Sequence, residues 1–215
     1  MEIYHNKFHN THIYLKFQDE EISRLNKSEF DELIRIHGKP LQVMISSEAK
    51  ELIEKLEESG FILKRRCFEM EVGKDELNTS LQKPTFKLKK ASKGSVEFTE
   101  CVEVMYDHYK KTHETVSPMT ATMSEFQSIL PEKAVFLSSA EKITAAAFVE
   151  DNEIAYICVR NESILDDFCN ALLCYMFEKY TDIVFEADDT DSVATYLRDL
   201  FVAIPETSFN TYIKH

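Results

Sequence analysis

Apolar side chains along residues 85–215 repeat with spacings that alternate between those of helices and those of strands. The clearest helix is predicted over residues 95–113, where apolar side chains recur at i, i+4, i+7, i+8 and i+11: Phe98, Val102, Met105, Tyr106 and Tyr109. A shorter helix follows, because Thr122-x-x-Glu125 is a capping box that precedes Pro131. Three short apolar segments then come in close succession, which is the pattern of a β-meander.

The alternation continues to the end of the chain. Strands are predicted over residues 134–138, 143–150, 154–160 and 182–187, helices over 166–180 and 191–200, and one or two strands over 201–213. A strand also precedes the long helix. A meander followed by crossover helices forms a mixed sheet with helices on both faces. The sequence therefore predicts an α/β fold.

The first part of the chain predicts a smaller α/β domain. Strands are expected over residues 2–17, 41–45 and 61–72, with one or two helices over 19–37 and another in the segment after Ser47. Residues 73–84 are polar and weakly periodic, so we interpret them as a linker. Domains are therefore expected at 1–82 and 83–215.

Helix boundaries in this first domain follow from its polar residues. Ser28-x-x-Asp31 has the capping-box pattern, Ser47 can cap the next helix, and Gly60 stands where a left-handed C-cap is needed. Residues 41–72 and 183–213 share the order strand, helix, strand. This echo suggests a degenerate internal repeat, although two unrelated β-α-β units would give the same order.

Charge and composition exclude several classes of function. The net charge is −13, and a field of that sign repels a polyanion, so binding of nucleic acid is not expected, whereas a cationic amine is weakly favoured. The chain start lacks a signal-peptide pattern, and the longest apolar stretches are far too short to span a bilayer. Five cysteines without a C-x-x-C pair are typical of reduced thiols. We expect a cytoplasmic protein that does not bind membranes.

Glycine is scarce, since only four occur and none follows Gly94. The Walker A, dinucleotide-binding and G-x-S-x-G patterns, which all need glycine, are absent. Residues 83–93 hold five lysines, which we interpret as a solvated edge strand rather than a phosphate site.

No metal site is expected from the histidines. His5, His9 and His12 have a spacing that invites a metal, but on a strand His12 would point away from the other two, so surface imidazoles are predicted. His108 and His113 lie on one helix at a spacing that does not suit a metal pair.

Two stretches carry a resemblance to a known family. Residues 134–159, from Ala134-Val-Phe-Leu to Ile154-Ala-Tyr-Ile-Cys-Val, resemble the central meander of the GNAT acetyltransferases. Residues 189–201, with Tyr196 in a helix before Leu200-Phe201, resemble the family's late helix, which bears a Tyr and precedes Gly-Phe. The resemblance covers about residues 85–215, and separately 40–72. It implies a mixed, mostly antiparallel central sheet flanked by helices, with the N-terminal domain as a partial repeat.

The resemblance also implies a site. In this family the strand matching residues 154–160 splays from its neighbour, and acyl-CoA pairs with its backbone, which assigns cofactor contacts at the strand end and the next loop: Ile157, Cys158, Val159, Arg160 and Ser163. Tyr196 matches the general acid that protonates the departing CoA thiolate, and Glu186 is the candidate base for a primary amine on a small molecule or protein. The alternative for Tyr196 is a core residue beside Val193 and Leu197.

The loop of residues 161–168 departs from the family's Gly-containing pyrophosphate loop. It has no glycine, and Ser163-x-x-Asp166 predicts a capping box that would occupy the N–H groups a phosphate needs. Loss of two or three charge-assisted hydrogen bonds, each worth about 1.5–3 kcal/mol, would weaken acyl-CoA binding strongly. Two hypotheses therefore stand: an acyl-CoA-dependent N-acetyltransferase, or an inactive GNAT-fold module that binds a ligand or partner, a second copy of the chain included.

Overall fold

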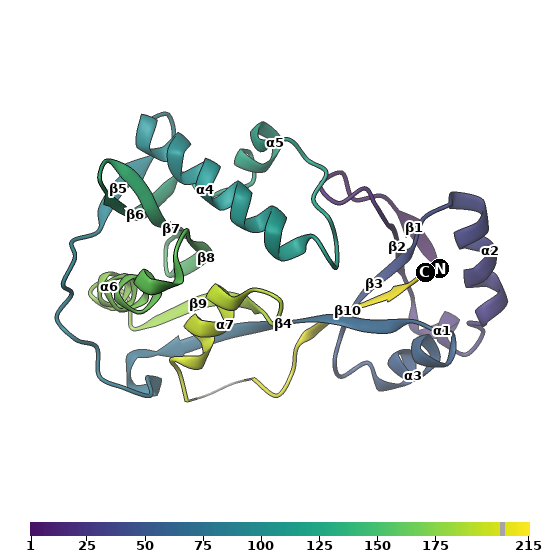
Figure 1. Cartoon of the computed structure of the whole chain (residues 1–215). Helices are drawn as coiled ribbons and strands as arrows, with labels where there is room; N and C mark the ends of the chain where they lie inside the picture. Colours follow the sequence, from purple (N-terminus) through teal and green to yellow (C-terminus); the bar gives the residue numbers. More distant parts are fainter. Residues whose placement is uncertain (203–204) are drawn as a thin grey trace. The chain divides into compact units, whose positions relative to one another are not determined.

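A computed structural model of the chain describes residues 1–202 and 205–215. It contains two compact units (Figure 1). Unit 1 comprises Met1–Phe68, His113–Ala121 and Glu206–His215, and unit 2 comprises Glu69–Thr112 and Thr122–Pro205. The division expected from the sequence, after residue 82, thus falls inside unit 2, and the end of the chain belongs to unit 1.

Unit 1 is a sheet with three helices. Its strands follow the order β1-β2-β3-β10-β4, with β2 and β3 parallel and the other neighbours antiparallel. The strands are β1 (Glu2–Tyr4), β2 (Ile13–Lys16), β3 (Leu41–Ser46), β10 (Phe209–Lys214) and β4 (Ile62–Gly73), which continues into unit 2. The helices are α1 (Asp19–Ile22), α2 (Lys27–His37) and α3 (Lys50–Glu58).

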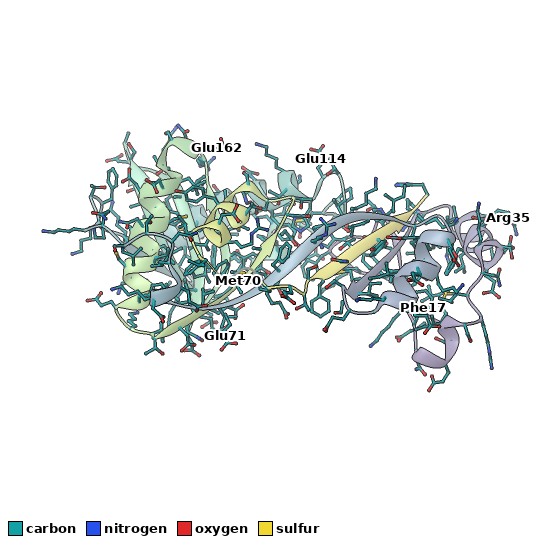
Figure 2. All side chains as sticks on the ribbon, turned by 90° about the horizontal axis from the view of Figure 1, so that it is seen from below. Phe17, Arg35, Met70, Glu71, Glu114 and Glu162 are labelled. Carbon is teal, nitrogen blue, oxygen red and sulfur yellow. The ribbon has the colours of Figure 1, made fainter. Side chains whose placement is uncertain are left out.

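Apolar side chains of these elements form one core. Phe30 of α2 is fully buried and packs edge-to-face on Phe17 and Phe61, at 6.1 and 5.0 Å between ring centroids. Figure 2 labels Phe17, which stands just after β2. Tyr212 of β10 belongs to the same core, so the last strand of the chain completes the packing of the first unit.

The helices of unit 1 begin at other residues than the sequence predicted. Asn26, not Ser28, caps α2: its side chain accepts hydrogen bonds from Glu29 N at 3.1 Å and from Ser28 Oγ at 2.6 Å. The predicted capping box at Ser28 is therefore wrong, because α2 already begins after Asn26. Gly38 ends it with φ of 62°, a left-handed conformation that glycine adopts without strain.

Ser47 does not cap α3 either, since α3 follows Ala49 without a side-chain cap. Ser47 instead holds the segment before β10, because its N donates to Ser208 O at 2.8 Å and its Oγ accepts from Ser208 N at 3.0 Å. Lys214, at the other end of β10, donates to Ser59 O at 2.7 Å and pairs with Asp31 at 2.8 Å. Ser47, which was predicted to cap α3, therefore pairs with the segment before β10 instead.

Unit 2 is the larger sheet, in the order β4-β9-β8-β7-β6-β5. Its strands are β5 (Lys89–Ser92), β6 (Lys133–Ser139), β7 (Lys142–Glu150), β8 (Glu153–Val159) and β9 (Asp182–Asp188). Its helices are α4 (Val96–His113), α5 (Met123–Gln127), α6 (Leu165–Phe177), α7 (Ser192–Asp199) and the 3-10 turns η1 (Lys74–Glu76) and η2 (Glu162–Ile164). The lysine-rich segment supplies the edge strand β5, and the antiparallel meander β6-β7-β8 is present as predicted.

The mixed, mostly antiparallel sheet flanked by helices is therefore confirmed. Helices α4 and α5 lie together beside the strands of unit 2 (Figure 1), and Tyr109 packs on Phe126 at 5.0 Å between ring centroids. The Thr122 capping box forms as expected, with its Oγ1 accepting from Glu125 N.

The tail differs from a simple repeat. β3-α3-β4 and β9-α7-β10 share their order, but β10 pairs with β3 and β4 in unit 1. Of the strands expected over residues 201–213, the structure shows β10 and an isolated bridge between Leu77 and Phe201, and residues 203–204 lie outside the described part.

Candidate functional site

Strands β8 and β9 separate along most of their length. Their parallel pairing covers only two positions, Glu153 with Val184 and Ile154 with Phe185. Beyond these, β8 pairs only with β7 among the described strands, up to Val159. We call the separated part, Tyr156–Val159 and Glu186–Asp188, the β8–β9 divergence. It leaves one backbone edge of β8 available to a ligand, as the family resemblance implied.

The predicted contact residues at the end of β8 differ in how far their side chains are exposed. Ile157 is 8% exposed and Cys158 is fully buried, and burial raises the pKa of the Cys158 thiol. Arg160 is held back against β7, since its N donates to Thr144 O and its Nε to Ile143 O. Val159 is half-buried.

The loop after β8 does not form the predicted capping box. Asn161 caps the turn η2 by accepting from Ser163 N at 3.0 Å, and α6 then begins at Leu165 with no side-chain cap. The η2 turn moves the start of α6 beyond the reach of Ser163, so that prediction is wrong. The acidic character of the loop remains, because Glu162, Asp166 and Asp167 are all exposed, and Figure 2 labels Glu162.

Asp166 has another partner. The Tyr196 hydroxyl, from α7, donates to Asp166 Oδ1 of α6 at 2.8 Å. Burial and this hydrogen bond raise the pKa of Tyr196 to about 12. Tyr196 is half-buried and not part of the core that Val193 and Leu197 join. A phenol in this state holds its proton more tightly than a free tyrosine, so protonation of a thiolate would require release from Asp166.

Residues 77–85, which include most of the predicted linker, pack against the first half of α6. Gln82 and Asn170 exchange two hydrogen bonds, Gln82 N to Asn170 Oδ1 at 2.9 Å and Asn170 Nδ2 to Gln82 O at 3.0 Å. Thr85 Oγ1 donates to Asp167 Oδ1 at 3.1 Å. Between linker and helix lies a cavity of about 280 Å³, which Asp166 and Asp167 line. A pocket with two carboxylates is better suited to a neutral or cationic group than to a pyrophosphate.

Glu186 lies on the β9 side of the divergence and is exposed. On β8, the pKa of Tyr156 is raised by burial and by the charge of Glu186. Tyr156 also packs on Phe126 and Tyr109, at 5.9 and 6.3 Å between ring centroids. The structure thus brings Glu186 to the divergence, whereas Tyr196 bonds to Asp166.

A histidine–aspartate pair, which no sequence pattern indicated, lies next to the end of β9. His108 Nε2 of α4 lies 2.8 Å from Asp191 Oδ2, and the two side chains are 13% and 15% exposed. Asp191 also caps α7 by accepting from Val193 N and Ala194 N. Burial would raise the pKa of Asp191, but His108 and the two N–H groups together hold it below its ordinary value. The role of Asp191 as a cap could have been predicted from the expected start of the helix at residue 191. Its contact with His108 could not, because the two residues are far apart in the sequence.

Of the three histidines predicted at the surface, His5 is exposed, whereas the prediction is wrong for His9 and His12. His9 and His12 are 8% and 5% exposed, because the turn between β1 and β2 packs within unit 1 against residues 113–121. His9 Nδ1 lies 2.6 Å from Ser117 O, and burial lowers the pKa of His12 to about 4. Across residues 1–202 and 205–215, no three His, Cys, Asp or Glu side chains gather as metal ligands would. Nor does that part of the chain contain a helix with the length and apolarity needed to cross a membrane.

No protein-family model matches the sequence, and no curated protein matches it. Solved structures do match. A GCN5-related N-acetyltransferase from Sphaerobacter thermophilus is 10% identical, with a TM-score of 0.61 over 99% of this chain and 75% of that one. A conserved protein from Enterococcus faecalis V583, described as a probable N-acyltransferase, is 11% identical, with a TM-score of 0.60 over 99% of this chain and 57% of that one.

A tandem GNAT protein from the clavulanic acid biosynthesis pathway also matches, at 8% identity and a TM-score of 0.53, over 95% of this chain and 75% of that one. Sequence identities this low support a shared fold but do not identify the substrate. The element order, the meander and the β8–β9 divergence agree with this match. The chain therefore has the fold of the GNAT acetyltransferases.

Proposed function

We propose that the chain is an N-acyltransferase that moves an acyl group from an acyl-CoA thioester to a primary amine. The observation that carries the proposal is the β8–β9 divergence, where β8 has a backbone edge without a strand partner in the described sheet. The amide groups of a pantetheine arm can pair with such an edge as another strand would. The net charge of −13 attracts a cationic amine.

In this reaction the amine nitrogen attacks the thioester carbonyl carbon, and the C–S bond breaks. Residues 157–160 of the β8 end would hold the donor by its arm. Tyr196, once released from Asp166, would protonate the thiolate, and Glu186 is the base that the sequence proposes for taking the proton from the amine. The acidic loop contributes little to this binding, so the arm supplies most of the affinity for the donor.

Isothermal titration of the full chain with acetyl-CoA and longer acyl-CoAs tests binding. We expect heat of binding and saturation, because the β8 edge does not depend on the loop. Absence of heat with every thioester would contradict the proposal. For catalysis, Tyr196→Phe should lower turnover of any accepted amine, while Tyr175→Phe, a tyrosine of α6 that bonds to Lys179, serves as the matched control.

A second candidate is a non-catalytic module that binds a ligand in the same region. The Tyr196–Asp166 hydrogen bond favours it, because it engages the hydroxyl that catalysis would need. A thermal-shift screen that finds a stabilising amine or thioester, together with no turnover in the wild-type chain, would support this candidate instead.

A further inference from the structure

The His108–Asp191 pair is placed where the transfer reaction needs a base. We propose that His108 is the general base that takes the proton from the attacking amine, and that Asp191 is the positioning residue that orients it. This inference rests on the proposed function. Four observations support it: the place of His108 on its helix, the fixed carboxylate, the available ring nitrogen, and the position of the pair beside the β8–β9 divergence.

His108 continues the buried face of α4. Phe98, Cys101 and Met105 form that face and are at most 1% exposed, and His108 follows Met105 by one turn. A polar ring at a largely buried position is costly unless it has a hydrogen-bond partner, whereas an apolar side chain would fill the place without one. Packing alone therefore does not account for a histidine here, which motivates a functional role.

The Asp191 carboxylate is fixed by its other bonds. Its Oδ1 accepts from Val193 N at 2.8 Å and from Ala194 N at 3.3 Å, which leaves Oδ2 for His108. A carboxylate held at both oxygens orients the imidazole and selects the tautomer with its proton on Nε2.

In that tautomer the other ring nitrogen, Nδ1, carries the lone pair. Within residues 1–202 and 205–215, Nδ1 of His108 has no hydrogen-bond partner, and it is not one of the fully buried atoms that lack one. A general base needs an acceptor atom that is not already engaged. An imidazole ordinarily titrates near neutral pH, which suits this task better than a solvent-exposed carboxylate.

The pair borders the divergence. Asp191 follows the end of β9, and its N donates to Asp188 O at 3.1 Å. On the other strand, the charge of Asp191 adds to burial in raising the pKa of Cys158. Tyr196 lies further along the same helix α7. The pair thus lies next to the segment where the thioester is expected.

Acyl transfer forms one C–N bond and breaks one C–S bond. The amine is attracted as R–NH₃⁺ and loses its first proton to solvent, and its nitrogen then forms a bond to the thioester carbonyl carbon while the C–S bond breaks. The second proton lost by nitrogen goes to His108 Nδ1, and Asp191 stabilises the imidazolium that results. The thiolate takes a proton either from Tyr196, which solvent then reprotonates, or from water, and His108 returns its proton to solvent. The products are the N-acyl amine and the free thiol.

Turnover of one accepted amine at saturating acetyl-CoA tests the assignment. His108→Gln should lower kcat by about 10²–10⁴-fold, the usual contribution of a general base, without changing the acetyl-CoA affinity. Asp191→Asn keeps an oxygen for the α7 cap and should lower kcat by at least about tenfold. His37→Gln, on an exposed turn of α2, is the control and should have no effect.

Two readouts separate catalysis from structure. Added imidazole should restore part of the turnover of His108→Ala, which a structural role would not allow. Nitrogen NMR should show that Nε2 of His108 carries the proton. An Nδ1-protonated ring, or unimpaired turnover of His108→Gln in an active wild-type background, would overturn the base assignment alone. A wild-type chain that neither binds acyl-CoA nor turns over any amine would overturn the proposed function and the base role with it.

Discussion

Asp191 combines a structural and an electrostatic role in one side chain. Its Oδ1 starts α7 and its Oδ2 holds His108. Because the pKa of Asp191 is held below its ordinary value, its ionised form stabilises the folded state. That contribution is fully present above the ordinary carboxyl pKa of about 4 and is lost as pH falls through the lower folded value.

Asp191→Ala should therefore destabilise the chain by about 1–2 kcal/mol from the lost cap alone, as measured by urea unfolding at pH 7. Asp191→Asn should cost less, because an amide oxygen still caps the helix. Its deficit relative to wild type should shrink as the pH falls below about 4 and the wild-type carboxylate takes up a proton. A deficit that grows with acidification would contradict the assignment.

At the scale of elements, β10 is an interior strand of the sheet in unit 1, between β3 and β4. Tyr212 anchors it from a core position at 3% exposure, whereas Phe209 on the same strand is 44% exposed. Tyr212→Ala should cost about 3–5 kcal/mol in the free energy of unfolding, since it empties a core site. Phe209→Ala, the matched control, should cost less than about 1 kcal/mol in the same denaturation series.

The start of α6 sets the expected donor preference. Asp166 and Asp167 line the cavity beside the linker. Each carboxylate near a helix start disfavours a phosphate by about 0.3–1 kcal/mol at low ionic strength. If the proposed function holds, Asp166→Asn with Asp167→Asn should tighten acetyl-CoA binding roughly 3- to 30-fold by calorimetry. Binding of acetyl-pantetheine, which lacks the pyrophosphate, should not change, and an equal gain for both donors would contradict this.

At the scale of the whole molecule, the sequence predicted most elements but not their assignment to units. The local spacing of apolar side chains determines the helix over residues 95–113 and the β6-β7-β8 meander, so both could be predicted from the sequence. Three results depended on contacts between distant segments, which spacing does not record: the use of Ser47 against Ser208, the placement of β10, and the His108–Asp191 pair. Of the predicted site, the parting of β8 from β9 is present, and the roles of Tyr196 and Glu186 stay predictions.

The path of the chain leads to a test of the expected division. A fragment of residues 1–82 lacks both β10 and residues 113–121, which belong to unit 1. It should show no cooperative thermal transition alone, and should gain one when mixed with the fragment 83–215. A cooperative transition of the isolated 1–82 fragment would instead support that boundary as an independent folding domain.

The position of β10 also bears on how the protein is made. Ribosomes add roughly 5–20 residues per second, and N-terminal domains commonly fold first. Here residues 1–68 cannot complete their sheet until Phe209–Lys214 have left the exit tunnel. Until then, β3 and β4 have open edges that other chains can pair with. A chain terminated before Phe209 would therefore lack the strand that lies between β3 and β4, more than 130 residues after them in the sequence.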